Sequence, residues 1–295
     1  MALRHFFLIL LVVTLWAFNN VAIKWGLLDL PPLFLTLMRF VVVALILVPF
    51  TRVNRAQLRY LLPLAFTFGF LHFSLLFVGM KYTDAGTGAI VVQLGTPFAM
   101  LLAMVILKEK LSVVQMTGIA VSLTGVVVLA GSPTIPSWWV LCILLCSAAG
   151  WAISNMLVKK SPPIKPLTMT GWLCFLAIPI VGLASWVMES NQIESLIHSS
   201  WRGWFGILYS AIFSSIIAYS LWYWLLRSYN VNLIMPYSLL TPVLAVIMGV
   251  VVLGDEMNMF KIIGALLVVA GTAIAVINLR NLRMHARLPK FRRLR

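Results

Sequence analysis

The stretch WAFNNVAIKW at residues 16–25 returns as WAISNMLVKK at residues 151–160, with Trp, Ala, Asn and Lys at the same spacing. Two more pairs of segments repeat at nearly the same shift. They are KEKLSVVQMTGIAVSLTG (108–125) with GDEMNMFKIIGALLVVAG (254–271), and LGTP (94–97) with LLTP (239–242). Because the matches fall near the start, middle and end of each half, they indicate two copies of one structural unit.

The composition indicates an integral membrane protein. Hydrophobic residues make up 62% of the 295 residues and charged residues 10%, and the mean hydropathy is +1.03. A soluble domain has roughly 45–50% apolar and about 25% charged residues. A net charge of +15 is typical of nucleic-acid binding in soluble proteins, but here the charges lie in short breaks between apolar runs, and we expect no nucleic-acid partner.

Apolar runs long enough to cross a bilayer, about 20 residues each, predict an all-α polytopic protein with ten transmembrane helices. The runs are 4–26, 31–50, 59–80, 84–107, 112–131, 136–158, 166–187, 203–226, 229–253 and 258–279. The duplication divides them into a first five-helix repeat (1–131) and a second (136–279). Because five is odd, the second copy enters the membrane from the opposite side. The sequence therefore predicts a 5+5 inverted repeat, a plan common among secondary transporters.

The distribution of basic residues predicts that both termini are cytoplasmic, since cytoplasmic loops are enriched in Lys and Arg. With that orientation only Lys24, Lys81, Arg202 and Lys261 fall outside, and Arg39 lies within a span. The remaining basic residues are cytoplasmic, most densely in the tail at 280–295. That tail either lies on anionic lipids or only fixes the topology.

The repeated motif places an amide and a lysine in apolar surroundings. Lys24 and Lys159 end their helices on opposite sides of the membrane, where each can extend its ammonium group to the nearest surface. Asn20 and Asn155 lie about one turn deeper, and an amide in hydrocarbon is costly unless it is paired. We therefore expect both to face the interior, either bonded to a neighbouring helix or lining a cavity.

Arg39 is the sharpest functional signal. It lies near the middle of the second span, where a charge costs at least roughly 2.5–3.5 kcal/mol. The corresponding position of the second repeat is Trp172 or Leu173, so the charge belongs to one half only. We interpret Arg39 as one pole of an asymmetric binding site. The alternative is a structural tether to backbone carbonyls or to Asn19 and Asn20.

Other buried polar and aromatic residues are candidates for the same site. His72 either exchanges protons near neutral pH or bonds a neighbouring carbonyl. Gln93 and Ser238 precede Pro97 and Pro242 in matching spans, where interrupted helices often form transporter sites; the two prolines are candidate hinges. Tyr219, Trp222 and Tyr223 fit either a pocket wall or an interfacial aromatic belt.

Several protein classes lack support in the sequence. No Walker motif, GxSxG elbow or HExxH helix occurs, and no carboxylate lies in the middle of a span. We therefore expect neither an enzyme nor a metal or cofactor. The seven acidic residues, at span ends and in loops, offer no intramembrane relay for protons or sodium.

The segment LWAFNNVAIKWGLLDLPPLFLTLMRF (15–40) resembles the opening of the ten-helix drug/metabolite transporter superfamily, the EamA-type exporters. The shared residues are Trp16, Asn19, Lys24, Gly26, Pro31, Pro32, Arg39 and Phe40. Ala17 and Asn20 depart from the family's Gly and Phe. The resemblance covers the whole chain and implies a bundle around a central cavity that exports small metabolites, often amino acids.

The resulting prediction is an inner-membrane secondary transporter that exports amino acids or their derivatives by alternating access. Arg39 would meet a substrate carboxylate, for which its guanidinium offers two parallel N–H donors. Asn19, Asn20, Gln93 and Asn155 would bond polar atoms, and the aromatic residues would form walls. Export of drugs or other lipophilic compounds is the alternative, and a non-transporting membrane protein is a further one. The oligomeric state and the coupling ion stay open.

Overall fold

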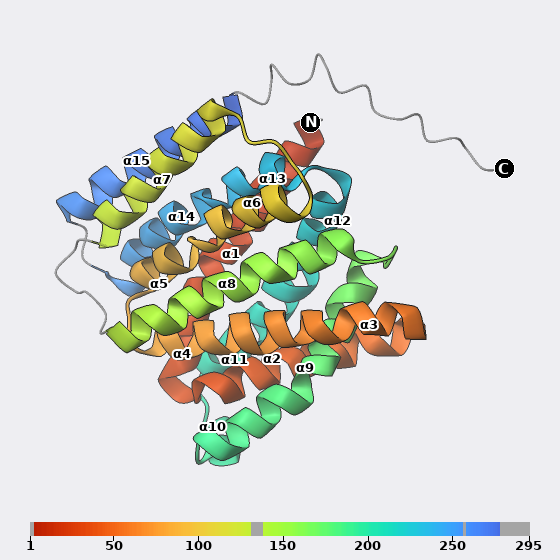
Figure 1. Cartoon of the computed structure of the whole chain (residues 1–295). Coiled ribbons are helices and arrows are strands. Elements are labelled where there is room, and N and C mark those ends of the chain that lie inside the picture. Colours follow the sequence, from red (N-terminus) through yellow and green to blue (C-terminus); the bar gives the residue numbers. More distant parts are fainter. Residues whose placement is uncertain (1–2, 131–137, 256–257, 278–295) are drawn as a thin grey trace.

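The computed structural model describes residues 3–130, 138–255 and 258–277, which form helices joined by loops, with no strand in these ranges (Figure 1). The basic tail at 280–295 and the ends of the second predicted repeat lie outside the described residues. The elements run in the following order. They are α1 (Leu3–Asp29), α2 (Pro32–Leu47), η1 (Val48–Phe50), α3 (Arg55–Leu64), η2 (Ala65–Ser74), α4 (Leu75–Lys81), α5 (Ala85–Val92), α6 (Gly95–Ile106), α7 (Val113–Ala130), α8 (Trp138–Lys160), α9 (Pro166–Met188), α10 (Gln192–Ile197), α11 (Trp201–Tyr209), η3 (Ser210–Tyr219), α12 (Ser220–Ser228), α13 (Val231–Ser238), α14 (Leu240–Met248), η4 (Gly249–Leu253) and α15 (Met259–Ile277).

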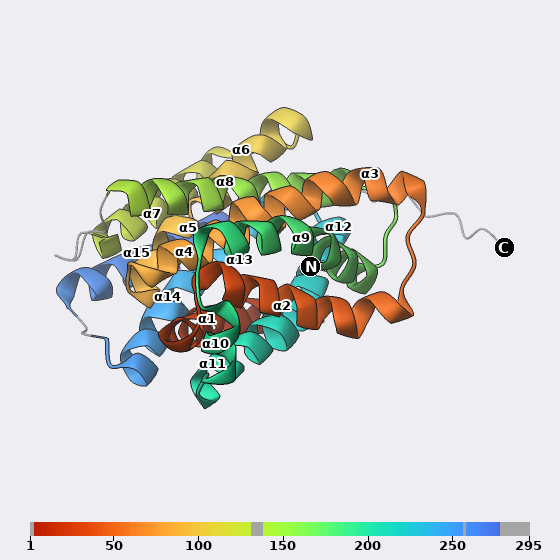
Figure 2. The same cartoon turned by 90° about the horizontal axis from the view of Figure 1, so that it is seen from below.

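Among the described residues, 8 helical segments are long and apolar enough to cross a membrane. They are Leu3–Asp29, Pro32–Phe50, Arg55–Lys81, Ala85–Ile106, Trp138–Lys160, Pro166–Met188, Trp201–Ser228 and Leu233–Leu253. The apolar helices α7 and α15 add a pair at one edge of the bundle (Figures 1 and 2). A Cβ on Gly271 would lie 2.6 Å from the Gly118 carbonyl oxygen. Glycine therefore allows the two backbones to touch.

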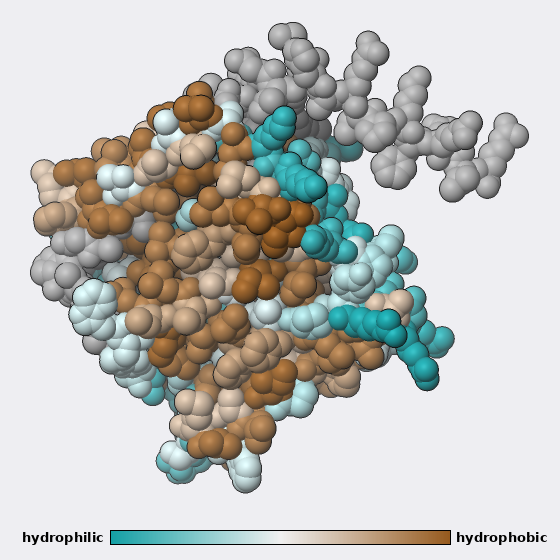
Figure 3. Space-filling view, in the orientation of Figure 1, coloured by the Kyte–Doolittle hydropathy of each residue, from teal (hydrophilic) through white to brown (hydrophobic). Residues whose placement is uncertain are grey.

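Charged residues gather at one end of the bundle. Arg55 at the start of α3 and Lys160 at the end of α8 are both exposed. In Figure 3 the hydrophilic residues line the right-hand edge, where these ends lie, and most of the remaining visible face is hydrophobic. This pattern is typical of a protein whose sides face lipid and whose ends face water.

The N-termini of α2 and α11 are each bound by a carboxylate from another part of the chain. Glu189, just after α9, accepts hydrogen bonds from the backbone N–H groups of Leu33 (2.7 Å) and Phe34 (2.9 Å) in the first turn of α2. Asp29, at the end of α1, accepts one from the backbone N–H of Ser200 (2.8 Å), the residue before α11. The first N–H groups of a helix have no partner within the helix and favour negative charge, so each carboxylate joins two helices.

Replacing Glu189 with Gln should weaken the junction between α2 and α9. The amide is uncharged and has only one acceptor oxygen, so one of the two backbone donors loses its acceptor and the other keeps an uncharged one, at a cost of about 1–3 kcal/mol. We expect the free energy of unfolding, measured by SDS titration in mixed micelles, to fall by this amount. Glu194→Gln is the matched control because Glu194 is exposed, and equal stability of the two variants would contradict the assigned role of Glu189.

Irregular helix recurs at the same place in each half. The π-helical segments η2 and η3 interrupt Arg55–Lys81 and Trp201–Ser228. Two other segments are divided, one at Gln93 and Leu94 between α5 and α6, the other at Leu239 between α13 and α14. Such interruptions leave backbone groups unpaired within the helix, and in membrane proteins they occur where the chain is buried in protein or lines a cavity.

Candidate functional site

A central cavity lies where the irregular segments meet. Its lining comes from α1, η2, α4, α5, α8, η3, α13 and α14. The lining residues are Trp16, Asn19, Asn20, His72, Phe73, Leu76, Ala89, Val92, Gln93, Trp151, Ser214, Tyr219, Ser238 and Thr241. This described lining is aromatic and uncharged, with amide, hydroxyl and imidazole groups.

The structure brings most of the predicted site residues to this cavity. Those on its lining are Asn19, Asn20, His72, Gln93, Tyr219 and Ser238. Arg39, Asn155, Trp222 and Tyr223 are buried but do not belong to the lining. They pack behind it and contact residues that do, so the predicted set divides into a lining and a layer that supports it.

Arg39 lies in this supporting layer and is fully buried on α2. Its Nε donates to the Ser215 hydroxyl at 2.7 Å, and its Nη2 donates to the Ser214 hydroxyl at 3.2 Å. The guanidinium carbon lies 3.8 Å from the centroid of the Phe73 ring. Nη1 has no hydrogen-bond partner among the described residues. The tether is thus made of serine hydroxyls rather than of backbone carbonyls or asparagines, and Nη1 is a buried donor without a partner among the described residues.

His72 is held by α8 and directed toward a tyrosine. Its Nδ1 lies 3.1 Å from the Ser147 carbonyl oxygen and 3.0 Å from the Ser147 hydroxyl, which itself donates to the His72 carbonyl at 2.9 Å. Because both neighbours of Nδ1 offer acceptors, the proton of a neutral ring is assigned to Nδ1. Nε2 is then the acceptor, and the Tyr219 hydroxyl lies 3.5 Å from it.

The two repeated asparagines have the same local bond and different surroundings. Nδ2 of Asn20 donates to the Trp16 carbonyl at 3.0 Å, and Nδ2 of Asn155 donates to the Trp151 carbonyl at 2.9 Å. Oδ1 of Asn155 also accepts from the Trp222 indole at 2.8 Å. Asn20 lines the cavity and has no equivalent partner for Oδ1 among the described residues.

Polar residues of the two divided segments meet at the cavity. Gln93 Nε2 donates to the Thr96 hydroxyl at 2.8 Å and to the Ser238 hydroxyl at 2.9 Å. Thr241, which corresponds to Thr96 in the other half, has no partner for its hydroxyl within the described chain. Pro97 and Pro242 lie in the first turns of α6 and α14, directly after the two interruptions.

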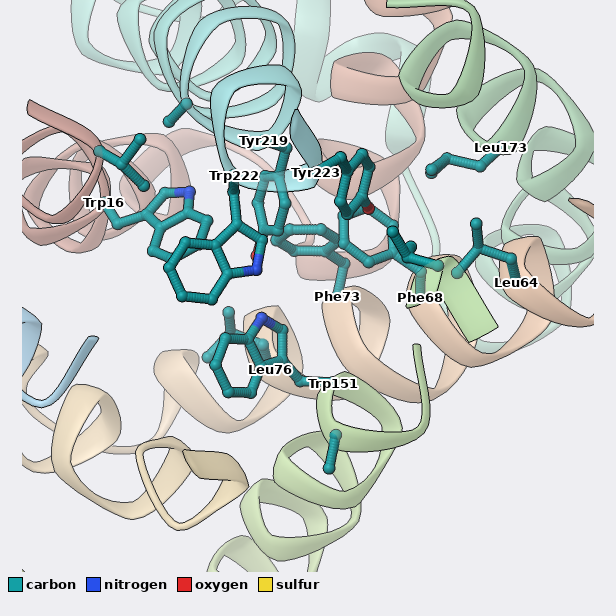
Figure 4. Packing of buried hydrophobic residues seen from close by; sticks show 14 of the residues in the cluster. Trp16, Leu64, Phe68, Phe73, Leu76, Trp151, Leu173, Tyr219, Trp222 and Tyr223 are labelled. Carbon is teal, nitrogen blue, oxygen red and sulfur yellow. The ribbon is translucent and has the colours of Figure 1, made fainter. Parts of the chain in front are cut away.

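Sequence reasoning gave no site role to several lining residues, above all Trp16 and Trp151. The Trp16 ring centroid lies 4.7 Å from that of Tyr219 and 5.1 Å from that of Trp222, and Trp222 stacks on Trp151 at 6.1 Å. Figure 4 shows these rings packed together. The signal that would have found the tryptophans is the repeated motif, in which both occupy the first position.

Phe73 and Ser214 were also missed, and both are the cavity-facing contacts of Arg39. Nothing in their local sequence distinguishes them from packing residues. No group of three or more His, Cys, Asp or Glu residues with metal-binding geometry occurs among the residues that the structure describes.

The chain is similar to known membrane transporters over nearly its whole length. A model of the EamA-like transporter family matches residues 3–131 and 137–277. A Salmonella typhimurium protein named "Probable amino-acid metabolite efflux pump" is 33% identical over 292 residues, which cover 95% of this chain and 97% of that protein. An Escherichia coli protein with the same name is 31% identical over 285 residues, which cover 92% of this chain and 95% of that protein.

One solved crystal structure has the same fold. It superposes with a TM-score of 0.72 at 17% sequence identity and covers 97% of this chain and 100% of that chain. The family match and the names of the two relatives indicate a transporter rather than an enzyme.

Proposed function

The chain belongs to the EamA-like transporter family, and from this premise we propose that it exports amino acids or their derivatives across the cell inner membrane by alternating access. The observation that carries the proposal is the central cavity, whose lining is uncharged while the Arg39 guanidinium lies directly behind it with a free donor. The two relatives named as amino-acid metabolite efflux pumps support this substrate class.

The proposed architecture is ten membrane helices in two inverted five-helix repeats, with both termini in the cytoplasm. The repeated lysines support it. Lys24 Nζ donates to the carbonyl oxygens of Met80 (3.2 Å) and Thr83 (2.9 Å) at the end of α4. Lys159 Nζ donates to the Leu226 carbonyl oxygen (2.8 Å) at the end of α12. Each lysine thus binds the C-terminus of the third segment of its own half, where helix carbonyls favour a cation.

In the proposed mechanism a substrate carboxylate enters beside Ser214. There the carboxylate gains the free Nη1 donor of Arg39, and the charge that is unpaired in the empty protein becomes paired. Ser214 and Phe73 separate Arg39 from the cavity, so a small displacement of these side chains accompanies binding. Gln93, Ser238, Asn19 and Asn20 offer hydrogen bonds to the polar atoms of the substrate.

Pro97 and Pro242 are the proposed flexible points for the change between inward-open and outward-open states. Each begins the second half of a divided segment, so α6 and α14 can tilt without breaking a continuous helix. The hydrogen bonds of Gln93 with Thr96 and Ser238 join the two interruptions across the cavity. Movement of one divided segment is thereby coupled to the other.

Counterflow into liposomes that contain the purified protein tests the proposal. We expect saturable uptake of at least one labelled amino acid from a panel, when the same unlabelled amino acid is trapped inside. Protein shown to be folded that exchanges no amino acid, but lowers the accumulation of a lipophilic cation, would replace the proposal with drug export.

A further inference from the structure

We propose that the carboxamide oxygen of Asn20 and the indole faces of Trp16 and Trp151 form a subsite for the ammonium group of the substrate. This inference rests on the proposed export of amino acids and adds the second pole of the binding site. It assigns different roles to the two repeated asparagines, since Asn20 contacts the ligand and Asn155 positions the cavity wall.

An ammonium group that enters this cavity meets no carboxylate among the lining residues. Its charge must then be stabilised by carbonyl oxygens and by aromatic faces, and tryptophan is the aromatic side chain that attracts cations most strongly. Trp16 and Trp151 both line the cavity, and their ring centroids lie 6.5 Å apart with an interplanar angle of 80°. The two indoles are thus in edge-to-face orientation at the cavity wall.

Asn20 supplies the acceptor beside Trp16. Its Nδ2 must be the nitrogen because it lies within hydrogen-bond distance of two carbonyl oxygens, those of Trp16 (3.0 Å) and Ala17 (3.3 Å). Oδ1 is thereby fixed as the free atom of the amide. Asn20 lies one helical turn after Trp16, and both line the cavity. The acceptor and one indole face therefore come from the same helix.

The second repeat cannot offer the same acceptor. Oδ1 of Asn155 is bonded to the Trp222 indole at 2.8 Å, and Asn155 does not belong to the lining. Trp222 packs against Trp16 and stacks on Trp151. Asn155 is therefore a positioning residue, which acts on the ligand only through the orientation of Trp222 and of the two lining indoles.

The two proposed poles lie at different places along the cavity wall. Tyr219 contacts Trp16 through its ring at 4.7 Å and Phe73 at 5.5 Å, and in Figure 4 it lies between them. Arg39 stacks on Phe73. The cavity thus has an aromatic end with a free acceptor and a second end beside a guanidinium, an arrangement that complements a zwitterion.

Two half-ligands test the subsite on the full chain purified in detergent. Isopentylammonium carries the cation without a carboxylate, and 4-methylpentanoate carries the anion without an ammonium. By isothermal titration calorimetry we expect Asn20→Leu to lower the affinity for isopentylammonium about tenfold, in the range of one cation–π or charge-assisted contact. The affinity for 4-methylpentanoate should not change. Asn20→Asp should raise the affinity for isopentylammonium and lower the affinity for 4-methylpentanoate. Trp186→Leu is the control, because Trp186 is 77% exposed and lies away from the cavity.

The outcomes separate this inference from the proposed function. Wild-type protein that binds no isopentylammonium, or an Asn20→Asp variant that binds it no better, would overturn the subsite. If counterflow shows amino-acid exchange in the same preparation, the export proposal stands without the subsite. If isopentylammonium binding depends on Asn20 but no amino acid is exchanged, the subsite stands and the cargo is a cation of another class.

Discussion

Arg39→Met should reduce amino-acid counterflow at least about tenfold while the purified protein stays as stable as the wild type or becomes more stable. The substitution removes the only cation beside the cavity in the described structure and keeps much of the side-chain volume. In the empty protein the guanidinium is fully buried, bonded only to the hydroxyls of Ser214 and Ser215, and has an unpartnered Nη1. A buried charge without a counter-charge is costly, so its removal does not require a loss of stability.

The loss of transport without a loss of stability makes this prediction specific. A structural tether would lose stability and transport together, whereas a substrate-binding group loses transport alone. Flux into liposomes and SDS titration of the same preparation measure the two quantities. Arg202→Met is the matched control because Arg202 is exposed at the start of α11. Undiminished flux in Arg39→Met would remove Arg39 from the transport mechanism.

The burial of Arg39 could be predicted from sequence, but the direction of its side chain could not. A charge in the middle of an apolar span must face protein or water, and this reasoning correctly placed Arg39 in the interior. Its hydroxyl partners are 175 and 176 residues away in the chain. The face of α2 that meets η3 depends on helix packing, which no local sequence pattern records. The sequence therefore indicated that Arg39 lines the cavity, whereas in the structure one layer of side chains separates Arg39 from the cavity.

For the helices, too, the local pattern was predictable from sequence and the effects of tertiary packing were not. Apolar length predicted the long segments, and Pro97 and Pro242 indicated where two of them are divided. The π-helical segments η2 and η3 were not predicted. Their setting is tertiary: a Cβ on Gly150 of α8 would lie 2.9 Å from the Thr67 carbonyl oxygen in η2. Close contact of this kind between backbones can shift the hydrogen-bond pattern of a helix, and it leaves no periodic signal in the sequence.

The repeated asparagines show how far the duplication itself predicts function. The motif correctly indicated that Asn20 and Asn155 face the interior, and the structure gives both the bond to the tryptophan four residues earlier. Their second partners come from other helices. Trp222 has no equivalent beside Asn20, so the two copies of the motif have different hydrogen-bond partners.

Asn155→Leu should therefore lower the free energy of unfolding by about 1–2 kcal/mol, and Asn20→Leu by less than about 0.5 kcal/mol. The first variant leaves the fully buried Trp222 indole N–H without an acceptor, and an unsatisfied buried donor costs roughly 1–3 kcal/mol, less where other polar groups within the bundle can replace the partner. The second removes only bonds to carbonyls that already accept within α1. SDS titration of both variants measures the difference in stability.

Counterflow of an amino acid and of its 2-hydroxy analogue measures the difference in transport. Asn155→Leu should slow the counterflow of both compounds alike because the cavity wall moves, whereas Asn20→Leu should slow the counterflow of the amino acid more. Equal destabilisation by the two substitutions would mean that Asn155 does not hold Trp222.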